Sequence, residues 1–102
     1  MLFRSDLAAA DCVVLASYRE GLPRSLIEAA AMGRPVIATD VPGCRAAVDN
    51  DVTGFLCAPR SGAALAEAML RFAALDEAAR HRMGEAARAK AEREFEIGRA
   101  HV

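Results

Sequence analysis

The sequence predicts an α/β fold in which helices flank a parallel β-sheet. Three short, continuous apolar runs have the length and composition of strands buried on both faces: Cys12–Ala16, Pro35–Thr39 and Phe55–Cys57. Segments with helical periodicity separate and follow these runs, so strands and helices alternate along the chain. Strands separated by helices pair in parallel through right-handed crossovers. The 102 residues suffice for one small domain.

The first part of the chain predicts a helix, a strand and a second helix. Residues 3–10 resemble the end of a helix that precedes the first strand. A loop at Ser17–Leu22 follows that strand. The next helix is expected at Arg24–Met32, because Pro23 presets the backbone of a first helical position and Gly33 suits a left-handed cap.

Turns rich in Asp, Asn, Pro and Gly separate the later elements. One turn is expected at Asp40–Gly43, after the second strand, and it leads into one or two helical turns at Cys44–Val48. Another is expected at Asp49–Asp51, with Gly54, before the third strand. The loop Pro59–Gly62 then leads into the last two helices.

The last two helices differ in their apolar pattern. In the helix near Ala63–Leu75, the residues Leu65, Met69 and Phe72 recur at the spacing of one helical face, which predicts a core stripe. The final helix, Asp76–Glu94, is rich in Ala and charge. Its charged side chains are expected to form a solvated face.

Composition excludes several classes of function. A net charge of −1 argues against nucleic-acid binding, and no apolar run reaches membrane-spanning length. Arg4 and Asp6 interrupt the start, so no signal peptide is expected. The three cysteines, Cys12, Cys44 and Cys57, lack metal-site spacing, and their odd number fits a reducing cytosol. With only two histidines, we expect no metal site, and we assign Cys12 and Cys57 to the core.

Two glutamates bracket the segment that carries most of the functional signal. Glu20 lies on the loop before the Arg24–Met32 helix, and Glu28 lies about one turn inside it. Gly21 permits a tight bend between them. The first backbone N–H groups of a helix have no intrahelical partner and face the positive end of the helix dipole, so they form an anion site. Two carboxylates that flank such a site suit a nucleotide sugar.

Six segments cover nearly the whole chain and occur in a recognisable order: Ala10–Ser17, Arg19–Ala29, Gly33–Asp40, Pro42–Arg45, Asp51–Leu56 and Leu65–Ala68. Together they resemble the carboxyl-terminal, donor-binding domain of family 4 (group 1) retaining glycosyltransferases. That family has the GT-B architecture, in which two Rossmann-like domains face each other across a cleft. The resemblance implies that residues 1–102 form the second half of one three-layer α/β/α domain, with about three strands.

The resemblance gives both glutamates a role. Glu20 would contact donor-sugar hydroxyls near the reacting carbon, so it is the candidate catalytic residue, although not a covalent nucleophile. Glu28 would hydrogen-bond the ribose diol and contribute binding. Judged without the resemblance, Glu20 is also compatible with a surface charge or a helix cap, and Glu28 with an ordinary solvated carboxylate.

The remaining donor contacts fall, by resemblance, on the turn and on the start of the helix. Backbone amides around Gly21 and Leu22 would touch the sugar, and those at Ser25 and Leu26 would touch the diphosphate. Arg24 is a candidate phosphate contact, with a solvent-facing arginine as the alternative. No metal or other cofactor is expected, because the helix dipole and basic side chains neutralise the leaving group.

The implied activity is transfer of a hexose from a nucleotide sugar, most commonly a UDP-sugar, to a hydroxyl acceptor in surface polysaccharide or glycolipid synthesis. A saccharide or lipid-linked acceptor would bind to a domain that this segment lacks. The expected location is the cytoplasm, near the inner face of the membrane. Family members usually carry Glu where Ala46 stands. The loss of this glutamate puts in doubt whether the loop is supported as it is in the family.

Two alternatives stay open at this point. The chain could be a non-catalytic fragment or assembly module, which would form homo-oligomers through an exposed edge of its first strand. It could also belong to another enzyme of the same architecture, such as a sugar-nucleotide epimerase. The segment Glu20–Glu28 favours the transferase.

Overall fold

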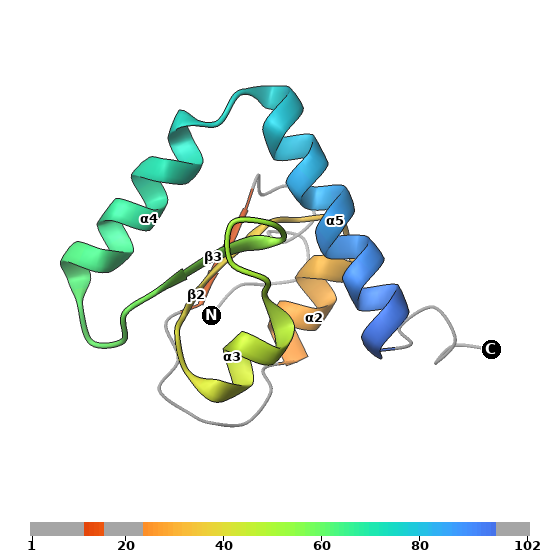
Figure 1. Cartoon of the computed structure of the whole chain (residues 1–102), viewed down its shortest axis with the longest axis horizontal. Helices are drawn as coiled ribbons and strands as arrows, with labels where there is room; N and C mark the ends of the chain where they lie inside the picture. The colour runs from red at the N-terminus through yellow and green to blue at the C-terminus, as the bar shows by residue number, and fades with distance from the viewer. Residues whose placement is uncertain (1–11, 16–23, 96–102) are drawn as a thin grey trace.

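A computed structural model describes residues 12–15 and 24–95 of the chain (Figure 1). The elements alternate as the sequence predicts: β1 (Val13–Leu15), α2 (Arg24–Ala31), β2 (Val36–Thr39), α3 (Pro42–Ala47), β3 (Gly54–Cys57), α4 (Gly62–Ala74) and α5 (Glu77–Phe95). The helix expected at residues 3–10 lies outside the described residues.

The three strands form one parallel sheet in the order β1-β2-β3, which confirms the predicted pairing. Val36 lies between Val13 on β1 and Gly54 on β3. The backbones meet closely at this level, because a Cβ on Gly54 would lie 2.0 Å from the carbonyl oxygen of Val36. Only glycine fits there.

Side chains that alternate along the strands supply two separate cores, one on each face of the sheet. The face covered by α2 and α3 buries Val13, Leu26, Ala29, Val36, Ala38, Cys44, Ala47 and Val48. The face covered by α4 and by part of α5 buries Ile37, Phe55, Cys57, Ala68, Phe72 and Met83. The predicted three-layer, Rossmann-like α/β/α arrangement is therefore confirmed (Figure 1).

Helix α4 packs through Leu65 and Phe72 of the predicted stripe, but not through Met69. Ser61 caps its start by accepting a hydrogen bond from the amide of Ala64 at 3.0 Å. Ala68 and Phe72 are buried, but Met69 is 48% exposed, so the assignment of Met69 to the core is wrong. The small Ala68 side chain, rather than the larger Met69, faces the sheet and lets the helix approach it closely.

Helix α3 begins earlier than predicted. Pro42 and Gly43, expected in a turn, form its first residues, and the helix ends at Ala47 rather than Val48. The preset φ of proline suits a first helical position and explains the early start.

Helix α5 leaves α4 and crosses to α2, where Ala87 and Ala91 pack against Ala30 (Figure 1). Two glycines let α5 approach the turn after α2 closely. A Cβ on Gly84 would lie 2.2 Å from the carbonyl oxygen of Gly33. Gly33 has φ +74°, which confirms the predicted left-handed cap of α2.

One charged residue of α5 contradicts the predicted solvated face. The Lys90 side chain is only 7% exposed, and its Nζ lies 2.8 Å from Glu94 Oε1 and 3.3 Å from Asp49 Oδ1. Burial lowers the pKa of Lys90, but its hydrogen bonds to Glu94 and Asp49 outweigh this effect and leave the pKa raised. The ammonium can be buried because two carboxylates neutralise it.

Candidate functional site

The carboxyl ends of the three parallel strands define one edge of the sheet, which we call the carboxyl edge. Helices α2, α3 and α4 each follow a strand and run back, so all three begin at this edge. Each helix start carries unpaired N–H groups and a partial positive charge. Ligands of open parallel sheets bind at this edge.

The described site residues of α2 divide between core and surface. Leu26 is 1% exposed and packs with Ala29, so only its backbone can face a ligand. Ser25 is half-buried, whereas Arg24 and Glu28 are exposed. Glu28 forms no ion pair within the described part of the chain. This placement agrees with an amide contact at Leu26 and leaves the Glu28 carboxylate accessible.

The other predicted donor contacts, Glu20, Gly21 and Leu22, lie outside the described residues. The roles assigned to them, and to the four residues of α2, stay predictions.

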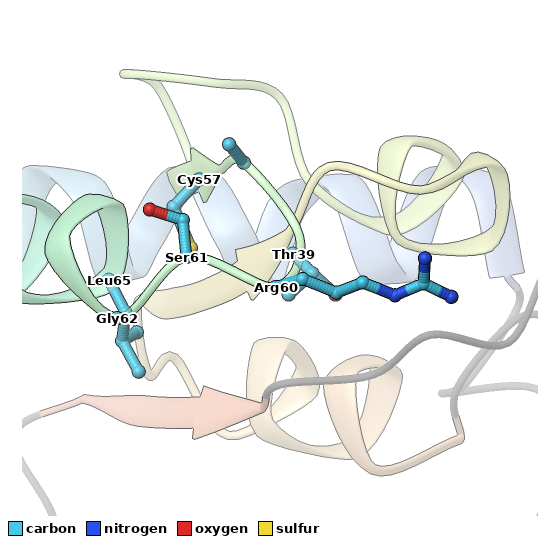
Figure 2. Close-up of a pocket in the computed structure, with 7 residues that line it drawn as sticks. Thr39, Cys57, Arg60, Ser61, Gly62 and Leu65 are labelled. Carbon is cyan, nitrogen blue, oxygen red and sulfur yellow. The ribbon is translucent and has the colours of Figure 1, made fainter.

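A pocket of about 310 Å³ opens at the carboxyl edge, beside the start of α4 (Figure 2). Seven residues line it: Thr39, Cys57, Ala58, Arg60, Ser61, Gly62 and Leu65. Thr39 and Cys57 are paired at the ends of β2 and β3. Figure 2 shows the Arg60 side chain extending away from Ser61 and Gly62, on the side toward which the β1 arrow points.

The chemistry of this pocket favours non-covalent binding. Burial, reinforced by the charge of Asp40, raises the pKa of the Cys57 thiol. Burial also raises the pKa of the Cys44 thiol, and this effect outweighs a hydrogen bond from Thr39, which lowers the pKa. Both thiols therefore stay protonated and unreactive near neutral pH. Arg60 supplies a cation.

The sequence alone did not indicate a role for Arg60 or the pocket around it. Arg60 lies in the short loop between the third apolar run and the Ser61 cap, and this position was the signal available in the sequence. Arg60 also adopts φ +59°, the left-handed region that a bulky side chain rarely occupies.

A second feature of the edge is the ion pair between Asp40 and Arg45. Arg45 Nε lies 2.6 Å from Asp40 Oδ1, so the acid that follows β2 is neutralised locally. Ala46 is exposed beside this pair on α3. A larger residue at this position would meet solvent rather than the core.

Within residues 12–15 and 24–95, no group of His, Cys, Asp or Glu side chains could hold a metal ion. Over the same ranges, none of the helices has the length and apolar character needed to cross a bilayer.

A three-layer α/β unit with several helix starts at the carboxyl edge of a parallel sheet defines a class, that of Rossmann-like domains. Comparison with known proteins narrows the class. The model of the family "Glycosyl transferases group 1" matches residues 4–90, and the chain belongs to this family of enzymes. The resemblance inferred from the motifs is confirmed.

Relatives support both the family and the fold. Glycogen synthase of Mycobacterium tuberculosis is 40% identical over 90 residues, which cover 88% of this chain and 22% of that protein. Sucrose-phosphate synthase of Thermosynechococcus elongatus superposes with a TM-score of 0.81 at 32% identity, over 93% of this chain and 25% of its own. Anabaena HepE, solved in complex with UDP-glucose, superposes with a TM-score of 0.78 at 30% identity, over 87% of this chain and 24% of its own.

The chain therefore spans about a fifth of the length of the glycogen synthase that it matches.

Proposed function

We propose that this chain is the donor-binding part of a retaining glycosyltransferase that transfers a hexose from a UDP-sugar to a hydroxyl acceptor. The observation that carries the proposal is the start of α2 at the carboxyl edge, where Leu26 is buried and Glu28 is exposed. This arrangement offers backbone amides to a diphosphate and a carboxylate to a ribose. The UDP-glucose bound by HepE supports the choice of donor.

In this proposal different residues contact different parts of the donor. Amides at Ser25 and Leu26 bind the diphosphate, with Arg24 as a supporting cation, and Glu28 accepts hydrogen bonds from the ribose diol. Glu20 contacts the sugar hydroxyls near the reacting carbon, and amides at Gly21 and Leu22 hold the sugar. The three helix starts stabilise the leaving diphosphate electrostatically, so the reaction needs no metal.

The deciding experiment is calorimetric or ligand-observed NMR titration of the folded chain with UDP, GDP and ADP. Selective binding of UDP is expected. Hydrogen bonds to a charged group contribute about 1.5–3 kcal/mol, so Glu28→Ala should weaken binding about ten- to a hundredfold. The matched control is Glu67→Ala, which removes an exposed glutamate from α4 and should leave affinity unchanged.

Three outcomes would each contradict part of the proposal. Equal UDP affinity in Glu28→Ala and the unmodified chain would remove the ribose role from Glu28. Binding that disappears in EDTA would contradict the metal-free site. Absence of nucleotide binding by a chain with native circular dichroism would overturn donor binding by this segment.

A second candidate function is a non-catalytic assembly module. One observation favours it: β1 forms one edge of the described sheet. An unpaired strand edge promotes association between chains. Sedimentation at high protein concentration should then show homo-oligomers, and a single monomeric species would count against the module.

For the whole enzyme we propose a saccharide or lipid-linked acceptor, bound by a domain outside this segment, and a role in surface polysaccharide or glycolipid synthesis. Its proposed location is the cytoplasm, at the inner face of the membrane. Fractionation of cells with an antibody against the parent protein tests this: recovery of the protein outside the cytoplasmic and peripheral membrane fractions would contradict it.

A further inference from the structure

The ion pair between Asp40 and Arg45 lies at the carboxyl edge, where the central strand of the sheet ends. The amide of Asp40 donates to the carbonyl of Cys57 at 2.7 Å, which extends the pairing of β2 with β3 by one residue. Strand β1 ends at Leu15, opposite Ala38, which precedes Asp40 by two residues. The backbone therefore holds Asp40 close to the ends of all three strands.

The same ion pair lies beside the start of α2. Val41, which follows Asp40, packs against the core cluster that contains Leu26. Cys44, which precedes Arg45, is buried in the same cluster. Helices α2 and α3 also lie against each other (Figure 1). The two charged side chains therefore border the part of the edge where the amides proposed to bind the donor diphosphate are found.

A single hydrogen bond joins the two side chains, and both keep polar atoms for a ligand. Nε of Arg45 donates to Oδ1 of Asp40 at 2.6 Å, and the two side chains are 57% and 47% exposed. Across residues 12–15 and 24–95, neither side chain forms another hydrogen bond or ion pair. Nη1 and Nη2 of the guanidinium therefore remain as donors, and Oδ2 of the carboxylate remains as an acceptor.

These free atoms suit a sugar better than a phosphate. The charges of Asp40 and Arg45 cancel, so the pair has no excess positive charge with which to attract an anion. A donor and an acceptor fixed side by side match hydroxyl groups, because each hydroxyl can donate and accept hydrogen bonds. Since Asp40 already holds the Arg45 side chain, less conformational freedom is lost when a ligand binds.

We propose that Asp40 and Arg45 bind hydroxyl groups of a saccharide at the carboxyl edge and so help to select the sugar. Arg45 donates to one hydroxyl oxygen, and Asp40 accepts from the same or an adjacent hydroxyl. The role assigned to the pair rests on the proposed function, which brings a sugar to this edge. The saccharide is either the hexose of the donor or the sugar of the acceptor, and the test separates these two sources.

The test is a ligand-observed NMR titration of the folded chain with UDP and with UDP-glucose. Arg45→Ala should weaken UDP-glucose binding about two- to tenfold, the effect of one lost hydrogen bond, and leave UDP binding unchanged. Asp40→Asn removes the carboxylate at constant size and should show the same difference between the two ligands.

The matched control is Arg71→Ala. Arg71 also pairs with an aspartate, Asp51, at 2.6 Å and with similar exposure, but this pair lies beside the turn that precedes β3. Its loss should leave the affinities for UDP and UDP-glucose unchanged. Circular dichroism of every variant checks that the fold is kept.

A further titration with maltose, in the presence of saturating UDP, identifies the source of the sugar. If Arg45→Ala weakened maltose binding and left UDP-glucose binding unchanged, the pair would contact the acceptor. If it weakened UDP-glucose binding alone, the pair would contact the donor hexose.

Equal loss of UDP and UDP-glucose affinity in Arg45→Ala would overturn the proposal, and so would unchanged affinity for both UDP-glucose and maltose. The ribose role of Glu28 has a separate signature, because Glu28→Ala should weaken UDP and UDP-glucose alike. If Glu28→Ala left UDP binding unchanged while Arg45→Ala weakened UDP-glucose alone, only the ribose role would fail. An unmodified chain that bound neither nucleotide and no maltose would overturn both the proposed function and the saccharide site.

Discussion

The two ends of the sheet carry positive charge of different origin. At the carboxyl edge it comes from the starts of α2, α3 and α4, and the acid Asp40 is neutralised by Arg45. At the amino end it comes from the side chains of Arg34 and Arg80. The ends also differ in packing, because a Cβ would meet backbone at Gly54 and Gly84 at the amino end, whereas Gly62 at the carboxyl edge has nothing within 4 Å.

Because of this difference, the two ends should respond differently to substitution. Truncation of a side chain leaves its backbone amide in place, so contacts made by the helix starts at the carboxyl edge should resist side-chain truncation. Conversely, added volume should disturb the amino end and be tolerated at the carboxyl edge. Three substitutions test this contrast.

The largest effect is expected from adding a methyl group at the amino end. Gly54→Ala and Gly84→Ala would each drive a Cβ into a backbone carbonyl, at 2.0 Å from Val36 and 2.2 Å from Gly33. Because the obstacle is backbone, each should cost about 3 kcal/mol or more of unfolding free energy. Chemical denaturation measures this loss.

The carboxyl edge supplies the control. Gly62 begins α4 and has nothing within 4 Å of an added Cβ, so Gly62→Ala should leave stability unchanged or raise it by about 0.5 kcal/mol. If all three glycine variants behaved alike, the packing contrast between the two ends would be wrong.

The sequence predicted the sheet because its signals are local. The runs that became β1, β2 and β3 are apolar throughout, and Gly33 follows the α2 pattern at the position of a cap. It did not predict the role of Gly84, which depends on a contact with Gly33 about fifty positions away. A glycine within a helical pattern carries no local sign of such a partner.

The next effect in size concerns Lys90 on α5, which forms an ion pair with Asp49, a residue that precedes β3 in the chain. Lys90→Met keeps the apolar stem and removes the ammonium, and should cost about 1–2 kcal/mol. Arg88→Met is the control: Arg88 is exposed and lies 3.7 Å from Glu92, so its loss should cost under about 0.5 kcal/mol.

The cost of Lys90→Met should depend on pH. The hydrogen bond from Lys90 holds the pKa of Glu94 below its usual value, so the stability that Glu94 contributes is present above that value and is lost as pH falls through the lowered one. The pKa of Lys90 is raised, so its contribution fades only as pH rises through that higher value. Denaturation curves should therefore show the variant and the unmodified chain converging as the pH falls through the lowered pKa of Glu94. A difference that does not change with pH would contradict the ion-pair explanation.

The smallest effect is expected at the carboxyl edge. Arg60 has φ +59°, and Arg60→Gly relieves that conformation, so stability should rise by about 0.5–1 kcal/mol. Arg60→Ala removes the same charge but keeps a Cβ, so it should not gain stability. A change in nucleotide affinity shared by both variants would identify Arg60 as a ligand contact, and a gain common to both would attribute the effect to charge.

The candidate site was less predictable than the sheet. Leu26 and Glu28 could be placed on α2 from apolar spacing and the Pro23 signal, and the structure puts one inside and one outside as a helix requires. The misassignment of Met69 has a physical cause: in a helix rich in alanine, side-chain size does not mark the face that packs. Lys90 was missed because its partner Asp49 is remote in sequence.

The placement of α5 also has a consequence for synthesis of the chain. Helix α5 comes last among the described elements, yet it covers Ala30 on α2 and packs against the turn at Gly33. While the chain emerges from the ribosome, strands β1 to β3 and helix α2 are made before the surface that covers them. The nascent chain must therefore hold part of its apolar surface in water until α5 appears, and a chaperone has its best opportunity to bind during that interval.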